Sequence, residues 1–286
     1  MILGKSFLNG VENAKLYLGS ILVYSGVNTD FIMTVKTDNT GSSNNYQFTI
    51  PTVAGNLYNV TTSDGQILNN NTDDLTINFP SAGTYDVNIS GDFKQILFNN
   101  GGDKSKLIGV KNWGNIAWTS FENSFHGCNN FNSYSATDSP DLSGVTSLKY
   151  SFARSSFNGD INLWDVSNVT DFFAMFFITS SFNQDLSSWD VSGANQMRFI
   201  FNGAVLFNQD LSSWNISNIS SLANFLSGST LSTANYDATL IGWANQIPLA
   251  YNGTLDFGNS TYTLGGAAST ARAALVSDVG AISDGG

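Results

Sequence analysis

The sequence has very few of the residues that build metal centres, disulfides or nucleic-acid surfaces. Its 286 residues include one cysteine and one histidine, which exclude an internal disulfide, a CxxC motif and a histidine-rich metal cage. Only 12% of the residues are charged, and 22 acidic against 11 basic side chains give a formal net charge of −11. Because recognition of phosphates depends on clustered Lys and Arg, we expect no nucleic-acid partner.

Long apolar runs are also missing. No segment approaches the roughly 18 apolar residues of a membrane-spanning helix, so no membrane insertion is expected. The N-terminus does not read as a secretory signal, because Gly4, Lys5, Asn9, Gly10 and Glu12 interrupt every candidate apolar stretch. For a chain of extracellular composition, this predicts either a piece of a secreted protein or a protein that leaves the cell inside an assembled particle, such as a phage virion.

What the sequence does contain is aromatic, small and uncharged polar. Hydrophobic residues make up 42% and aromatic residues 13% of the chain, with 27 glycines and four prolines. About 35 asparagines supply much of the polarity, well above an ordinary share. This composition favours β structure with tight turns around a sizeable core.

The N-terminal residues 1–30 are predicted to be an attachment segment or hairpin. Two short apolar runs within residues 15–26 flank Gly19 and Ser20, a pattern typical of a β-hairpin. The run is similar to short segments of phage structural proteins, which implies attachment to other virion subunits. A hairpin docked on the next domain is the alternative.

Residues 31–98 are predicted to form an antiparallel β-sandwich. Apolar and polar residues alternate in several short segments separated by Gly, Asn and Asp turns. The predicted strands are 31–36, 46–50, 57–60, 75–79, 85–89 and 95–98. Residues 80–90 resemble the corresponding strand of PKD-type immunoglobulin-like domains, which implies a spacer or scaffold. Asp73 and Asp74 are predicted to lie in a solvated turn, with calcium binding left open.

A 25-residue repeat dominates the second half of the sequence. Four residue types each recur at one position of the unit: Phe157, Phe182 and Phe207; Asn158, Asn183 and Asn208; Asp160, Asp185 and Asp210; Trp164, Trp189 and Trp214. A period of about 20 to 29 residues is typical of leucine-rich-repeat-like solenoids, whose units bury their apolar faces against each other. We therefore expect the Phe and Trp rings to stack, and the asparagines to form a ladder of hydrogen bonds to turn backbone.

Two segments of the unit have recognisable local patterns. In residues 170–177 the spacing of Phe172, Met175 and Phe176 predicts a short helix with one buried face. Residues 187–191 are predicted to be extended, with alternate side chains buried.

The repeated sequence motifs closely resemble those of a known family. The motif SFNQD followed by LSSWDVS is similar to that of the BspA-like leucine-rich-repeat surface proteins, and residues from about 100 to 231 share the resemblance. It implies a mixed β and α/β fold class, in which an N-terminal antiparallel PKD/Ig-like sandwich precedes a solenoid with a parallel strand ladder and short helices. The predicted domains are 99–231 for the solenoid and 232–286 for a C-terminal cap with two short helices. The family resemblance also implies adhesion or recognition at a surface.

Two sets of residues are candidates for contact with a partner. The first set faces outward from the predicted strand ladder: Leu163, Asp165, Ser188, Asp190, Ser213 and Asn215. The second set is Phe173 and Phe199, where aromatic residues depart from the repeat pattern. These two are predicted to be either additional core filler or an exposed patch for a partner subunit or receptor.

The sequence contains no convincing arrangement of catalytic residues. His126 and Cys128 are close in sequence, but without a third orienting group they are predicted to be structural. The repeated aspartates occupy equivalent positions, which is typical of stacking and not of a unique active site. We therefore expect no enzyme activity, no cofactor and no metal. The expected function is recognition or adhesion on a phage virion, through a host surface protein or glycan, with a homo-oligomer possible in principle. A purely architectural virion protein and an adhesin on a bacterial cell surface are the alternatives.

Overall fold

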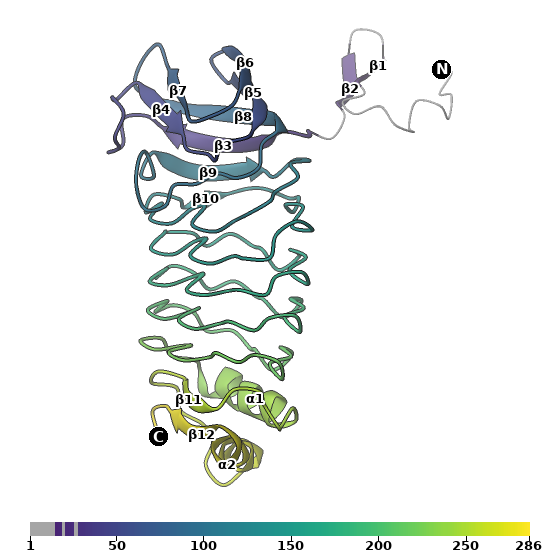
Figure 1. Cartoon of the computed structure of the whole chain (residues 1–286), viewed down its shortest axis with the longest axis vertical. Helices are drawn as coiled ribbons and strands as arrows, with labels where there is room; N and C mark the ends of the chain where they lie inside the picture. Colours follow the sequence, from purple (N-terminus) through teal and green to yellow (C-terminus); the bar gives the residue numbers. More distant parts are fainter. Residues whose placement is uncertain (1–14, 19–20, 26–27) are drawn as a thin grey trace.

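A computed structural model describes residues 15–18, 21–25 and 28–286. The structure is mixed, mostly sheet with two helices, and it is elongated: a sheet lies at one end, the helices at the other, and stacked turns of chain lie between them (Figure 1). Strands β1 (Lys15–Leu18) and β2 (Ile21–Ser25) form an antiparallel pair of their own. The pair coincides with the predicted hairpin, while its turn at Gly19 and Ser20 and the first 14 residues of the predicted attachment segment lie outside the described residues.

The N-terminal part contains two sheets. Six strands are ordered β10-β9-β3-β8-β5-β6, and β4 pairs with β7 in a second sheet. Their bounds are β3 Phe31–Lys36, β4 Gln47–Ile50, β5 Leu57–Thr62, β6 Ile67–Asn71, β7 Leu75–Asn78, β8 Thr84–Asp92, β9 Leu107–Asn112 and β10 Ser133–Tyr134. Alternate residues of β3, β4 and β5 are fully buried, because successive side chains of a strand point to opposite faces.

One predicted strand is absent, and strands β6, β9 and β10 were not predicted. Residues 95–98 contribute only an isolated bridge between Ile96 and Thr52, so the strand predicted there is wrong. Strand β9 lies beyond the boundary predicted at residue 98 and pairs with β3. The sheet therefore continues into the region predicted as repeats, and β10 pairs with β9 in parallel.

A buried ion pair fastens the loop before β4. The Asp103 carboxylate accepts hydrogen bonds from the backbone N–H groups of Ser43 and Thr49 at 3.0 and 2.7 Å. Lys106 Nζ lies 3.9 Å from this carboxylate and donates to the carbonyl oxygens of Ser43, Asn44 and Gln47. Burial works against the charge on Asp103, but the hydrogen bonds from Ser43 and Thr49 hold the pKa of its carboxyl below the usual value.

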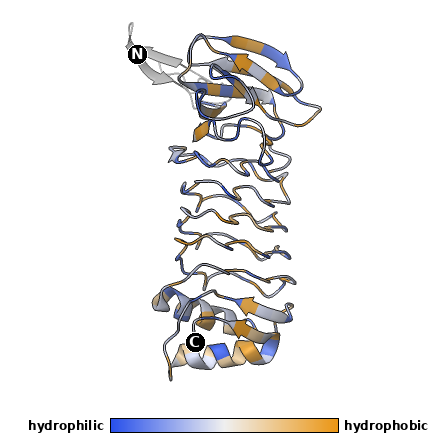
Figure 2. Ribbon diagram, turned by 90° about the vertical axis from the view of Figure 1, so that its left-hand side faces the viewer, coloured by the Kyte–Doolittle hydropathy of each residue, from blue (hydrophilic) through white to orange (hydrophobic). Residues whose placement is uncertain are grey.

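Successive 25-residue units are stacked between the two ends of the molecule. Parallel bridges connect Ser147 to Asp171, Asp171 to Gln196, and Gln196 to Ser221. Hydrophobic and hydrophilic residues alternate along the stacked turns (Figure 2). A single unit has too little surface to bury its own aromatic rings, so each unit depends on its neighbours.

The short helix predicted at residues 170–177 is not formed. The segment is a run of turns in which amide groups alternate between two kinds of acceptor. Met175 N–H donates to the Phe172 carbonyl of the same unit, whereas Ala174 N–H donates to the Arg198 carbonyl of the next unit. Ala174 and Ile178 have left-handed φ values of 53° and 54°, which a right-handed helix does not contain. The predicted burial of the segment's apolar face is nevertheless present, because Phe172, Met175 and Phe176 are fully buried.

No strand forms at residues 187–191. The predicted alternation holds: Trp189 and Val191 are buried, while Ser188 and Asp190 are exposed. The parallel bridges fall instead on Asp171 and Gln196, at the start of each run of turns.

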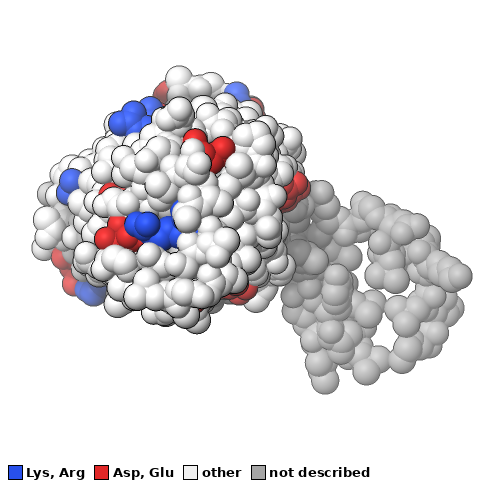
Figure 3. Space-filling view, turned by 90° about the horizontal axis from the view of Figure 1, so that it is seen from below, with Lys and Arg blue, Asp and Glu red and all other residues white. Residues whose placement is uncertain are grey.

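The C-terminal part closes the stack. Helix α1 (Thr233–Ala244) and helix α2 (Ala267–Val279) form where two short cap helices were predicted. Strand β11 (Gly253–Asp256) pairs in parallel with β12 (Gly280–Ser283). Seen from this end, charged side chains are few, and some acidic and basic ones lie side by side (Figure 3). Within the described residues, no helix is long and apolar enough to span a bilayer.

Candidate functional site

The six predicted ladder contacts all lie on the surface. Leu163 is 81% exposed, and the other five, Asp165, Ser188, Asp190, Ser213 and Asn215, are also exposed. The two carboxylates among them already accept hydrogen bonds within their own turns. Asp165 Oδ1 accepts from Ser167 N–H at 3.1 Å, and Asp190 Oδ1 accepts from Ser192 N–H at 3.0 Å. Hydrogen bonds from the side chain and backbone of these serines lower the pKa of both aspartates. These side chains hold tight turns.

Most of the residues expected to be structural lie in continuous stacks. Trp164 is the exception, because it packs edge-on against Trp113 at 5.2 Å and does not stack on Trp189. The rings of Phe157, Phe182 and Phe207 are nearly parallel, with centroids 6.2 and 6.1 Å apart. Trp189 and Trp214 stack with centroids 6.3 Å apart.

The asparagines connect the units. Asn158 Oδ1 accepts from Asn183 N–H at 2.9 Å, and Asn183 Oδ1 accepts from Asn208 N–H at 2.8 Å. Asn208 Oδ1 then accepts from Ser232 N–H at 2.7 Å, immediately before α1. Each of these asparagines therefore fixes the backbone of the following unit.

Phe173 and Phe199 are half-buried in a row of aromatic side chains. Their rings form a T-shaped pair with centroids 5.7 Å apart. Tyr150 packs on Phe173 at 5.2 Å, and Phe177 packs on Phe199 at 6.4 Å. These four residues, here called the aromatic edge, line with Ala174 a cavity of about 160 Å³.

Two arginines cover the aromatic edge. The Arg154 guanidinium carbon lies 5.3 Å from the Phe177 ring centroid, and that of Arg198 lies 5.4 Å from the Phe199 centroid. Both arginines are exposed, and neither forms a salt bridge with any described residue. With Lys149, which pairs with Glu122 at 3.3 Å, they are the three Lys and Arg residues of positions 119–231, against nine Asp and Glu. The unpaired positive charge of an acidic region is thus concentrated beside half-buried aromatic rings.

The sequence indicated only half of the aromatic edge. Tyr150 was missed because it belongs to a degenerate unit, although its N–H donates to the Phe173 carbonyl of the next unit. Phe177 and the two arginines were missed because their proximity depends on the run of turns and not on a helix. The available signal was the spacing of Tyr150 and Phe173, which is close to one repeat.

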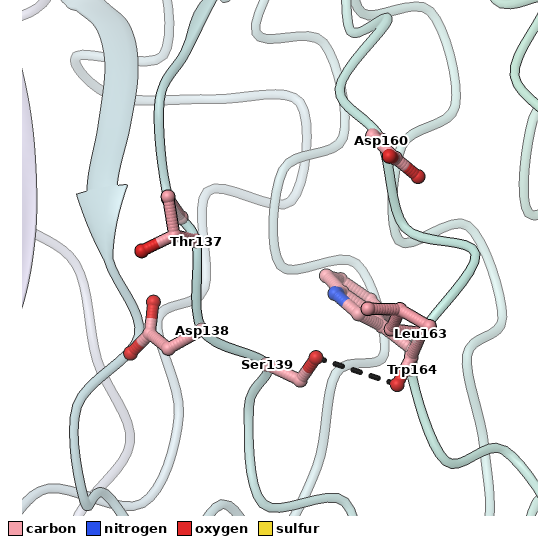
Figure 4. Close-up of a pocket in the computed structure, with 7 residues that line it drawn as sticks. Thr137, Asp138, Ser139, Asp160, Leu163 and Trp164 are labelled. Carbon is pink, nitrogen blue, oxygen red and sulfur yellow. Dashed lines mark hydrogen bonds between the residues drawn. The ribbon is translucent and has the colours of Figure 1, made fainter.

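A second cavity lies beside Trp164, near the start of the stack. It has a volume of about 220 Å³ and is lined by Ala136, Thr137, Asp138, Ser139, Asp160, Leu163 and Trp164. Ser139 Oγ donates to the Leu163 carbonyl across it at 3.4 Å (Figure 4). Leu163, predicted from the sequence as a ladder contact, is therefore placed at a cavity and not on a flat face.

The residues considered as candidates for catalysis or metal binding are buried or already in contact with other residues of the fold. Cys128 is fully buried, and burial raises the pKa of its thiol well above the usual value, which disfavours the nucleophilic thiolate. His126 stacks on Tyr150 at 5.4 Å. Asp74 accepts from Thr52 N–H at 2.7 Å. Over the described part of the chain, no three His, Cys, Asp or Glu side chains are grouped to hold a metal ion.

Comparison with known proteins places the stacked units in one family model. Residues 119–239 match the family described as Mycoplasma protein of unknown function, DUF285. No curated protein and no solved structure matches the chain. The matched region contains both the aromatic edge and the cavity beside Trp164.

Proposed function

We propose that the protein is a non-enzymatic recognition module that binds a surface through the aromatic edge. In the finer form of this proposal, residues 99–231 are a BspA-like leucine-rich-repeat solenoid, residues 31–98 a PKD/Ig-like sandwich that acts as a spacer, and residues 232–286 a cap. The parallel bridges 24 or 25 residues apart and the match to residues 119–239 support the repeat assignment.

The observation that carries the proposal is the combination of unpaired arginines and half-exposed aromatic rings. Tyr and Arg are enriched in binding interfaces, where they offer large contact areas and directed hydrogen bonds. Arg154 and Arg198 each retain guanidinium N–H groups without a carboxylate partner while their planes rest near Phe177 and Phe199. A structural role alone requires the rings but not the two unpaired cations.

The partner expected from this chemistry is a surface protein or glycan with acidic groups. A carboxylate on the partner would accept a bidentate hydrogen bond from an arginine, and an apolar or sugar face would cover the rings. The rest of the repeat region is acidic and would repel such a partner, which favours binding at this edge.

The test is binding of the purified full chain to bacterial envelope preparations, wall-bearing and wall-less. Phe173→Ser/Phe199→Ser and Arg154→Glu/Arg198→Glu should each weaken binding at least tenfold, and the charge-reversed variant leaves the ring packing in place. Val205→Ser/Leu206→Ser is the matched control, because it removes two exposed apolar side chains that do not line the edge. Near-UV circular dichroism and light scattering report folding and oligomeric state.

Two outcomes would overturn the proposal. If the charge-reversed variant binds as the wild type does, the edge is not the contact surface. If the phenylalanine variant only unfolds and the charge-reversed variant is unaffected, the rings are core filler.

Placement on a phage virion is the most specific part of the proposal. It rests on the similarity of the N-terminal run to phage structural proteins, and predicts that the chain is found in the proteome of purified particles, in contact with other virion subunits. A chain found in particles without any envelope binding would indicate the architectural alternative, and a chain recovered only with bacterial cells would indicate a cell-surface adhesin.

A further inference from the structure

The cavity beside Trp164 lies where the repeat pattern is broken. In the later units, each tryptophan donates its indole N–H to a backbone carbonyl of the preceding unit: Trp189 to Ile161 at 2.9 Å and Trp214 to Leu186 at 3.0 Å. Trp243 of α1 donates to Leu211 in the same way at 3.0 Å. For Trp164 the residue 28 positions earlier is Ala136, but Trp164 Nε1 has no hydrogen-bond partner.

A buried donor without an acceptor is unfavourable. Leaving one unpaired costs about 1–3 kcal/mol, and Trp164 is only 3% exposed. The Tyr134 hydroxyl lies close to this N–H, but the geometry of a hydrogen bond is not reached, and the hydroxyl accepts from Trp113 Nε1 at 2.8 Å instead. Figure 4 shows the indole nitrogen on the side of the ring turned toward the segment of Thr137 and Ser139.

Two further departures from the repeat occur at the same place. Gly159 replaces the glutamine found at positions 184 and 209, and a Cβ at residue 159 would lie 2.4 Å from the Tyr134 ring. Leu163 replaces the serine found at positions 188 and 213, and this leucine is largely exposed at the cavity. A missing hydrogen bond, a glycine and an exposed leucine thus converge on one cavity, whereas stacking alone favours identical units.

The lining defines the chemical class of a ligand. It contains two carboxylates, two hydroxyls, the Trp164 indole and the apolar side chains of Ala136 and Leu163, and no Lys or Arg. An anion would be repelled by Asp138 and Asp160. The Asp138 carboxylate already accepts three hydrogen bonds of 2.8–3.0 Å from the backbone N–H groups of Trp113 and Gly114. Few of its lone pairs are therefore left to bind a cation.

We infer that this cavity binds one uncharged sugar ring. Sugar hydroxyls donate to Asp160 and the neighbouring hydroxyl oxygens, and the apolar ring face packs on Leu163 beside the Trp164 indole. The volume of about 220 Å³ equals roughly seven waters at about 30 Å³ each, which suits one ring and not an oligosaccharide. This site deepens the proposed surface recognition by naming a ligand class, but it uses none of the residues of the aromatic edge.

The test is a titration of the ¹⁵N-labelled full chain with methyl glycosides of glucose, galactose, mannose and N-acetylglucosamine. The six tryptophans give separate indole N–H signals, and Trp164→Phe assigns the one that reports on the cavity. We expect a saturable shift of this signal with at least one glycoside, at a dissociation constant of about 1–10 mM, as befits a ligand of this size.

Variants that restore the repeat residue test the geometry. Leu163→Ser should weaken binding about tenfold, since it removes the apolar contact, and it should not impair folding because Leu163 is exposed. Gly159→Gln should abolish binding by displacing Tyr134. Leu206→Ser is the matched control, because it also replaces an exposed leucine by the serine found at the same position of other units, Ser156 and Ser181, away from the cavity.

Several results would overturn the inference. They are the absence of any shift of the Trp164 signal up to about 50 mM of each glycoside, equal affinity in Leu163→Ser, and a response to calcium alone. If no glycoside binds but envelope binding is intact, the sugar site is refuted and the aromatic edge remains the proposed contact surface. If the edge variants bind the envelope as the wild type does but the glycoside titration succeeds, the aromatic edge is refuted and the sugar site remains.

Discussion

The asparagine ladder offers the sharpest test of how the units are held together. In Asn183→Ala the chain loses the side-chain oxygen that accepts from Asn208 N–H at 2.8 Å and from Gln209 Nε2 at 2.7 Å. A hydrogen bond contributes about 0.5–1.5 kcal/mol net, so two bonds near the surface should lower the free energy of unfolding by about 1–2 kcal/mol.

Urea unfolding followed by tryptophan fluorescence measures this loss. With an m value of about 3 kcal/mol/M, the midpoint should fall by about 0.3–0.7 M. Asn158→Ala and Asn208→Ala should give similar shifts, because their side-chain oxygens also accept from the backbone of the next segment.

Asn168→Ala is the matched control, since Asn168 is exposed and no hydrogen bond involving its side chain is present among the described residues. The reasoning is refuted if Asn183→Ala unfolds at the wild-type midpoint, or if Asn168→Ala shows the same loss.

Two other perturbations test backbone strain and acid sensitivity. Ile178 has a left-handed φ of 54° where later units have Gly203 and Gly228, so Ile178→Gly should raise the free energy of unfolding by about 1 kcal/mol, because a left-handed L-residue costs about 1–2 kcal/mol; a lower melting temperature would contradict this. Burial opposes ionisation of Asp284, but hydrogen bonds from Arg272 and Tyr236 hold its pKa below the usual value. The stability that this carboxylate provides is therefore present above about pH 4 and lost as the pH falls through its lowered pKa. Asp284→Asn should lower the melting temperature at pH 7, and the difference from wild type should shrink progressively below pH 4; a difference independent of pH would show that the charge is not the cause.

Much of the fold could be predicted because it depends on local or strictly periodic patterns. Alternation located β3 and β7 to within a residue, and the 25-residue period located the stacked aromatic rings. The cap helices follow from short amphipathic segments such as the one that buries Tyr236, Leu240 and Trp243.

The remaining features depend on contacts between distant residues. The spacing of Phe172 and Phe176 fits a helix, but amides that bond to Gln196 and Ile200 of the next unit stabilise a run of turns instead. The left-handed conformation at Ala174 has no signal in residue type, since such positions normally favour glycine or asparagine; at Ile178 the only signal is the glycine found one and two repeats later.

The candidate sites were predictable only in part for the same reason. Phe173 and Phe199 stand out as departures from the repeat, whereas Arg154 and Arg198 join them only through the turns. Leu163 was selected for its place on a ladder. Its position at a cavity depends on how the degenerate segment around Ala136 and Ser139 packs beside it, which the 25-residue period alone does not define.

The most direct test of the recognition proposal is hydroxyl-radical footprinting of the full chain, free and bound to an envelope preparation. Binding through the aromatic edge predicts reduced oxidation of Tyr150, Phe173 and Phe199 in the bound state, with oxidation of the distant and exposed Tyr46 unchanged. Bound protein whose edge residues are oxidised as readily as in the free state would contradict the proposal.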